Sequence, residues 1–124
     1  MTQSLDLVSL AVLAVDRATS VGFLRLATLF LAQAFDLATF RIMVARHGVI
    51  AEANPIVSDV FVSFGMSAVV IAKLALVLLI GCLCVAAAAR GGRGVWSMVG
   101  GLPLALAIAA GLIGGITNTA AFLR

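Results

Sequence analysis

The sequence predicts an all-α integral membrane protein, a small polytopic bundle of three transmembrane helices with one further helix at its N-terminus. Its 124 residues are 64% hydrophobic and 10% charged, and the mean hydropathy is +1.26. A soluble domain of this size has too little interior to cover so much apolar surface. Residues 21–45, 66–89 and 96–123 each reach the length of about 20 mostly apolar residues that a bilayer crossing needs. We therefore expect one membrane domain over residues 1–124.

The net charge of +3 does not indicate a nucleic-acid-binding protein, because the arginines are scattered at the ends of apolar stretches. Such side chains reach from the membrane edge into water. Arg90 and Arg93 follow the second stretch, and Arg17 and Arg25 lie near the start of the first. Since positive residues favour the cytoplasmic side, we expect a multi-pass protein of the cell membrane whose N-terminus and 90–95 turn are cytoplasmic. Its expected partner is the lipid bilayer and not nucleic acid.

The N-terminal segment, residues 1–20, is predicted to form an amphipathic or short apolar helix. Asp6, Ser9 and Asp16 belong to a narrow polar stripe on an otherwise apolar helix. A helix of this kind lies in the membrane interface or packs beside the spans. The alternative is a fourth short span, which would place Asp6 and Ser9 in hydrocarbon.

Asp36 lies inside the first predicted span, residues 21–45, where a charge is costly. Wound as a helix, this segment places Asp36 on the same face as Ala32 and Thr39, with Arg41 on the opposite face. Apolar residues continue beyond Asp36, so the helix does not simply end there in water. We therefore expect Asp36 to face the other helices.

Residues 46–65 are predicted to form a loop that contains a short helix. Gly48 follows a basic pair, which is a common pattern at the end of a helix. Asn54 suits the N-cap of the next helix, and Pro55 suits its first turn. Gly65 is the expected joint before the second span.

The second predicted span, residues 66–89, contains a single charge, Lys73. The glycine-rich turn at residues 90–95 is long enough only to link antiparallel neighbours. In the third span, residues 96–123, small residues on one side would let helix backbones touch. These positions are Gly100, Ala107, Gly111, Gly114 and Gly115. Asn118 falls in the same sector, so we expect its amide to face protein.

The three spans bring polar side chains to a similar depth. With a rise of about 1.5 Å per residue, Asp36 lies about 13 Å and Lys73 about 10 Å from the membrane face that carries the loop. The third span returns to this face, and Asn118 precedes its end by about one turn. We predict a cluster of Asp36, Lys73 and Asn118, covered by Glu52 and Asn54 of the loop.

Two functions are open for this cluster. As a structural element, an intramembrane Asp–Lys pair with amide support fixes helix register and packing. This case predicts a non-catalytic accessory or assembly subunit that associates with another membrane protein or with itself. Alternatively, intramembrane ionisable residues often bind ions, protons or head groups. That case predicts a small carrier or membrane enzyme centred on Asp36, Lys73 and Glu52.

Recognisable catalytic and metal-binding patterns are missing from the sequence. His47 is the single histidine, without a second ligand at metal-binding spacing. No set of residues resembles a Ser-His-Asp or Cys-His nucleophile, and a chain with one polar cluster has no second half for alternating access. We therefore favour a non-catalytic role and assign no metal, and the sequence does not identify a cofactor.

One pattern in the middle of the chain resembles a known family. It consists of Asp36-Leu-Ala-Thr39, Gly48, Glu52-Ala-Asn54-Pro55, Gly65 and Lys73. An Asp with a following Thr in one span, E-x-N-P before the next span and a Lys within it resemble an uncharacterised family of small prokaryotic membrane proteins, known as a domain of unknown function. The resemblance implies an integral membrane protein of bacterial or archaeal type and supplies no activity.

Overall fold

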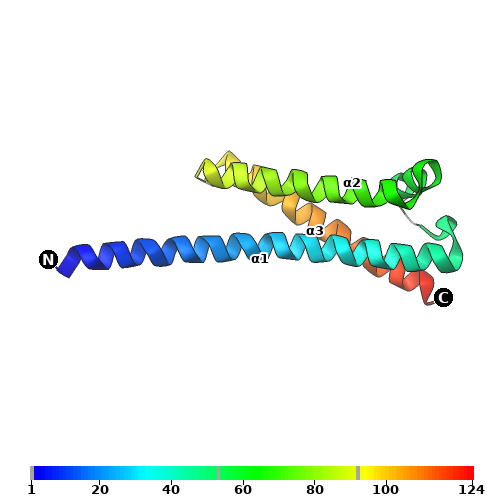
Figure 1. Ribbon diagram of the computed structural model, residues 1–124, viewed down its shortest axis with the longest axis horizontal. Coiled ribbons are helices and arrows are strands. Elements are labelled where there is room, and N and C mark those ends of the chain that lie inside the picture. The colour runs from blue at the N-terminus through cyan, green and yellow to red at the C-terminus, as the bar shows by residue number, and fades with distance from the viewer. Residues whose placement is uncertain (1, 53, 92) are drawn as a thin grey trace.

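A computed structural model describes the backbone of residues 2–52, 54–91 and 93–124, and before residue 22 only the side chains of Ser9, Val12 and Leu13. The described residues form helices and no strand, which confirms the expected all-α bundle. Helix α1 covers Thr2–His47, and the short 3-10 helix η1 covers Val49–Ala51. Helix α2 covers Pro55–Ala89, and α3 covers Val95–Phe122 (Figure 1).

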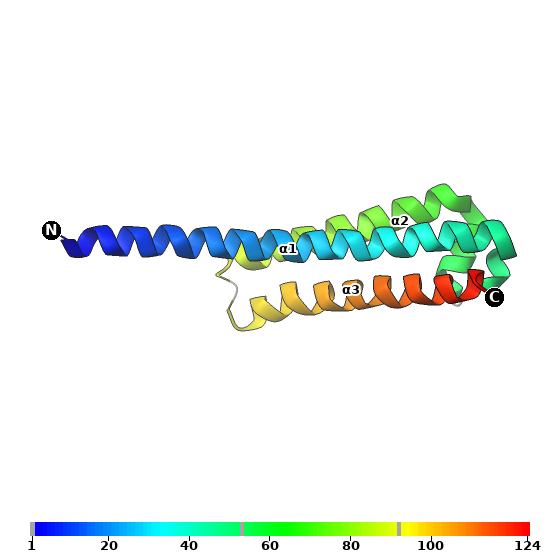
Figure 2. The ribbon, with the colours of Figure 1, turned by 90° about the horizontal axis from the view of Figure 1, so that it is seen from below.

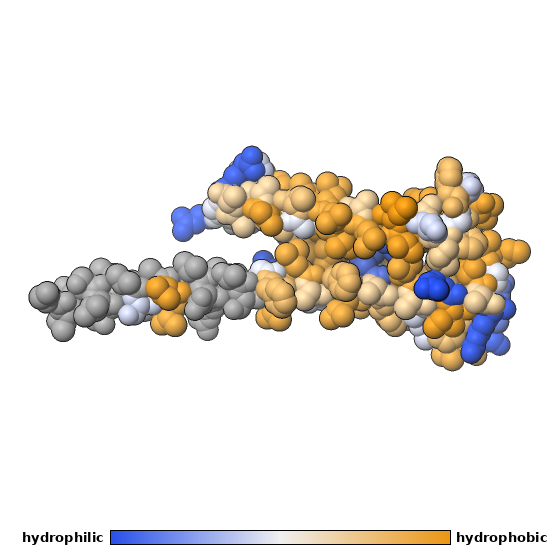
Figure 3. All heavy atoms as spheres, viewed as in Figure 1, coloured by the Kyte–Doolittle hydropathy of each residue, from blue (hydrophilic) through white to orange (hydrophobic). Residues whose placement is uncertain are grey.

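Three helical stretches are long and apolar enough to cross a membrane. They are Gly22–His47 of α1, all of α2 and all of α3. Many large apolar side chains on these helices point outward, and the space-filling view shows apolar residues over most of the bundle with hydrophilic residues near its ends (Figure 3). Lipid chains satisfy such a surface, whereas water would not. The protein is therefore a multi-pass membrane protein in contact with the bilayer.

A separate N-terminal helix was expected over residues 1–20, but residues 2–20 continue into the first span without a break as part of α1. No proline lies in this part of the chain, and the single Gly22 costs only about 1 kcal/mol of helix stability. A helix of 46 residues is about 69 Å long, roughly twice the thickness of the hydrocarbon core. Its N-terminal part extends beyond the turn between α2 and α3 (Figures 1 and 2). Of the polar stripe expected there, the described side chains include only the exposed Ser9.

Helix α2 contains a kink at Gly65, where φ is 81° and ψ is −176°. Residues with a Cβ rarely adopt this φ, so glycine permits the change of direction. Before the kink, residues 55–64 form a short helical segment. Asn54 caps it through Oδ1, which accepts a hydrogen bond from the backbone N–H of Ile56 at 3.1 Å. Pro55 fits the first turn because its missing N–H needs no partner there.

Helix α3 packs against both other long helices, whereas α1 and α2 have few contacts with each other. One apolar cluster comprises Leu29, Ile80, Leu104 and Ala107. A second comprises Phe40, Met43 and Val69. Gln33 and Asp36 lie on α1 between these two clusters. Polar side chains of α1 are therefore flanked on both sides by apolar packing between helices.

The small residues of α3 lie at its contacts with the other two helices. Gly100 faces α2, where an added Cβ would lie 3.0 Å from the Cβ of Ala87. Gly111 faces α1, where an added Cβ would lie 2.9 Å from the carbonyl of Ala32. Because any larger residue would meet backbone at this second position, α1 and α3 approach as closely as the small-residue spacing allows.

Candidate functional site

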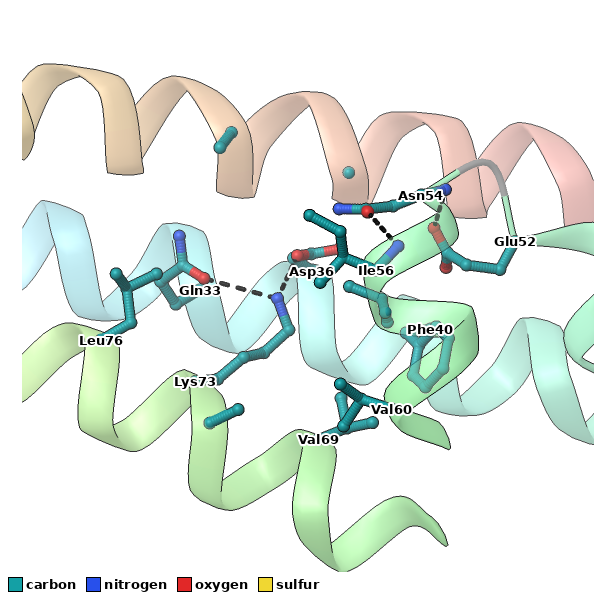
Figure 4. Close-up of a pocket in the computed structure, with 14 residues that line it drawn as sticks. Gln33, Asp36, Phe40, Glu52, Asn54, Ile56, Val60, Val69, Lys73 and Leu76 are labelled. Carbon is teal, nitrogen blue, oxygen red and sulfur yellow. Dashed lines mark hydrogen bonds and ion pairs between the residues drawn. The ribbon is translucent and has the colours of Figure 1, made fainter. Parts of the chain in front are cut away.

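The centre of the candidate site is an ion pair between two helices. Asp36 of α1 contacts Lys73 Nζ of α2 through its Oδ2 atom (Figure 4). The exposed fractions of the two side chains are 14% for Asp36 and 15% for Lys73. Asn118 of α3 donates a hydrogen bond from Nδ2 to Asp36 Oδ1 at 3.1 Å. The carboxylate of α1 therefore has one polar partner from α2 and one from α3.

Gln33 belongs to the same network and was not predicted as a site residue. Its Nε2 donates to the carbonyl oxygen of Ala107 in α3 at 2.7 Å, and its Oε1 accepts from Lys73 Nζ at 3.5 Å. The side chain is buried. The available signal was its position three residues before Asp36, which places both on one helix face.

The predicted cover residues, Glu52 and Asn54, lie beside the network without bonding to it among the described hydrogen bonds. Glu52 Oε1 accepts from the backbone N–H of Asn54 at 2.8 Å, and the Asn54 side chain caps α2. Both residues line a cavity that also reaches Asp36 and Lys73 (Figure 4). The loop is therefore bonded within itself and is separated from the ion pair by open space.

This cavity has a volume of about 250 Å³ and lies between α1 and α2. Its polar lining consists of Gln33, Asp36, Glu52, Asn54 and Lys73, and most of the remaining lining is apolar. Helix α3 contributes Ala110 and Gly114 on the third side. In the space-filling view, hydrophilic surface is visible between α1 and α2 within otherwise apolar surroundings (Figure 3).

The small residues of α3 leave room for the polar side chains of α1. A Cβ added to Gly111 would lie 2.8 Å from Gln33 Nε2, and one added to Gly115 would overlap the ring of Phe35. The backbone of Ala107 supplies the acceptor for Gln33. The glycine-rich face therefore packs against α1 of the same chain and makes space for the network.

Within the part of the chain that the structure describes, every buried side-chain nitrogen or oxygen has a hydrogen-bond partner. In that same part, no three His, Cys, Asp or Glu side chains gather where they could hold a metal ion. His47 is exposed at the end of α1. The arrangement can hold the helices in one register and can present charge to the cavity.

A family model described as a domain of unknown function, DUF5658, matches residues 26–121. The chain belongs to the DUF5658 family. The DUF5658 match covers most of the first span, α2 and nearly all of α3, so it includes every residue of the network. It begins after the N-terminal part of α1. No curated protein and no solved structure matches the chain. Membership confirms the resemblance seen in the sequence and assigns no activity.

Proposed function

We propose that this protein is a non-catalytic accessory or assembly subunit of a larger membrane complex, in which the buried polar network has a structural role. The network is well suited to that role because its members bond to one another. Asp36 has partners from α2 and α3, and Gln33 bonds to the α3 backbone. Interhelical contacts of this kind favour one packing arrangement over its alternatives.

The N-terminal extension of α1 is the observation that supports a partner. It continues past the end of the bundle, and no other described helix lies beside it (Figures 1 and 2). Its sequence is mostly apolar, and its described apolar side chains, Val12 and Leu13, are exposed. An apolar helix of this length gains most of its stability from packing, and none of the other described helices lies beside it. The partner is another membrane protein or a second copy of this chain.

The experiment is purification of the full chain in a gentle detergent, followed by light scattering and mass spectrometry. The wild type is expected in a stoichiometric complex, and Leu13→Glu is expected as a monomer, because the charge would face the partner. Ile50→Glu is the matched control, since this loop side chain is 95% exposed at the opposite end of the bundle. A wild type that purifies alone as a monomer would contradict the proposal.

The proposed orientation has the N-terminus and the turn before α3 in the cytoplasm. Arg90 and Arg93 lie in this turn, and Arg25 lies near the first residue of the membrane-spanning stretch Gly22–His47 of α1. The Arg90 guanidinium stacks on the Trp96 ring at 4.4 Å from its centroid. A cation and a tryptophan at one end of a bundle are typical of the membrane interface.

A second candidate function is binding of a small ligand in the cavity between α1 and α2. The cavity itself favours it, because it joins the intramembrane ion pair to the loop that carries Glu52. Structural polar networks do not require open space next to them. Both a carrier and a membrane enzyme would bind their ligand in this space, so ligand binding is the property to test.

A further inference from the structure

We propose that the cavity beside Glu52 binds a small organic ammonium ion, taken either from a free amine or from the head group of an aminophospholipid. This inference rests on the second candidate function, ligand binding, and is independent of the assembly role. It follows from the balance of charge around the cavity, from the cavity's size and from the distribution of its apolar walls.

The side chains that line the cavity have a negative net charge. Asp36 and Lys73 form an ion pair and neutralise each other. Glu52 is the third charged residue of the lining, and it forms no ion pair among the described residues. Its hydrogen bond from the Asn54 backbone occupies Oε1, and a carboxylate has acceptor sites beyond one such bond. The lining therefore carries a formal charge of −1 at neutral pH, which favours a monovalent cation.

The same balance disfavours an anion. Lys73 would be the natural partner of a phosphate, but its ammonium group already contacts Asp36 Oδ2 and Gln33 Oε1. A phosphate would have to displace Asp36 from this contact and would also approach Glu52. Like charges at short distance in a poorly solvated site repel strongly.

The size and the walls of the cavity favour an organic cation over a bare metal ion. A volume of about 250 Å³ has room for a small organic group and is below the range of drug-sized pockets. The walls include Val57, Val60 and Val69, which offer contact to a short hydrocarbon chain and no ligand to a metal. In a primary ammonium with a few attached carbons, the charged group suits the Glu52 carboxylate and the hydrocarbon suits the valine walls.

The position of Glu52 suits either source of the amine. Glu52 lies in the loop at the end of the spans, which is the region where lipid head groups lie. Apolar surface covers most of the bundle (Figure 3). An ethanolamine head group could therefore reach Glu52 from the bilayer, and a free amine could reach it from water.

The test is isothermal titration calorimetry of the full chain in phosphatidylcholine nanodiscs, with n-butylammonium chloride and sodium butyrate as probes. Wild type is expected to bind butylammonium saturably and not butyrate. Glu52→Gln keeps an acceptor for Asn54 but removes the charge, and it is expected to weaken binding by more than about tenfold. Asp59→Asn is the matched control, because Asp59 is an exposed carboxylate of the same region that does not line the cavity. It is expected to bind as wild type does.

The source of the amine follows from the same titration in nanodiscs that also contain phosphatidylethanolamine. A head group that occupies the cavity raises the apparent Kd for butylammonium, whereas an unchanged Kd assigns the site to a free amine. Thermal unfolding without ligand verifies that Glu52→Gln is folded. Absence of saturable butylammonium binding, equal binding by Glu52→Gln, or preference for butyrate would overturn the proposal. Any of these results leaves the assembly role untouched, since that role is tested by co-purification.

Discussion

Asp36 and Gly114 face each other across the contact between α1 and α3, so closely that a Cβ added to Gly114 would lie 2.5 Å from Asp36 Oδ1. The same oxygen accepts the hydrogen bond from Asn118, one turn further along α3. Glycine at position 114 therefore provides the space in which the carboxylate meets its partners from two helices.

Gly114→Ala should destabilise the bundle by about 1–3 kcal/mol, because the new methyl group displaces the Asp36 carboxylate from Asn118 and Lys73. The measurement is the free energy of unfolding in detergent micelles. Gly101→Ala is the control, since nothing lies within 4 Å of a Cβ at that position. Alanine is the better helix former by about 1 kcal/mol, so Gly101→Ala should leave stability equal or slightly higher. Equal stability of the two variants would contradict the prediction.

Removing one member of the ion pair should lower the free energy of unfolding more than removing both members does. Asp36→Asn leaves the Lys73 ammonium without its carboxylate, and Lys73→Met leaves the carboxylate without its cation. Each single change should destabilise by about 3–5 kcal/mol, the usual cost of an unpaired buried charge. The double variant has no charge to compensate, and its asparagine still offers an oxygen to Asn118.

The measurement for the pair is a double-mutant cycle of unfolding free energies. The double variant should be more stable than the sum of the single changes predicts, by at least about 1 kcal/mol. Arg41→Gln serves as the control for loss of an exposed charge, with an expected change below about 0.5 kcal/mol. Additive effects of the two single changes would show that Asp36 and Lys73 are not coupled.

The fold class could be predicted because the bilayer restricts a spanning chain to helices that satisfy their own backbone. The apolar stretches then indicated three spans, although α2 begins at Pro55 and extends beyond the span predicted at residues 66–89. The continuity of α1 could not be predicted with the same ease. Residues 1–20 have a different pattern from the span, yet the sequence around Gly22 contains no residue that ends a helix. A change of pattern marks a change of surroundings and does not break a helix.

The candidate site was partly accessible to sequence reasoning. Charge within an apolar stretch identified Asp36 and Lys73, and helical periodicity placed Asn118 on the same side of its helix as the glycines. Gln33 carries no charge and, unlike Asn118, does not share a helix face with a set of glycines, so the sequence did not single it out. The distance between α1 and α2 has no signature in the sequence, so the cavity beside Glu52 and the ion pair could be found only in the structure.

The proposed orientation makes a prediction for chemical labelling. In a background with Cys82→Ala and Cys84→Ala, Ile50→Cys and Val95→Cys place one exposed thiol at each end of the bundle. A membrane-impermeant maleimide should label position 50 in intact cells and position 95 only after permeabilisation, because the arginine-rich turn is proposed to be cytoplasmic. The reverse labelling pattern would show that the protein has the opposite orientation in the membrane, with the same fold.

The kink at Gly65 makes a prediction that separates backbone strain from steric contact. A Cβ at Gly65 would meet nothing within 4 Å, so any cost of Gly65→Ala arises from its φ of 81°. With a ψ of −176°, this backbone conformation is almost restricted to glycine and costs other residues about 1–3 kcal/mol, so the unfolding free energy of Gly65→Ala should fall by that amount. Gly81→Ala is the matched control, because Gly81 also has open space around it but lies within α2 without a positive φ. It should be neutral or stabilising. Equal effects of the two substitutions would mean that the chain does not need the left-handed conformation at position 65, and that the short segment before the second span adopts another direction.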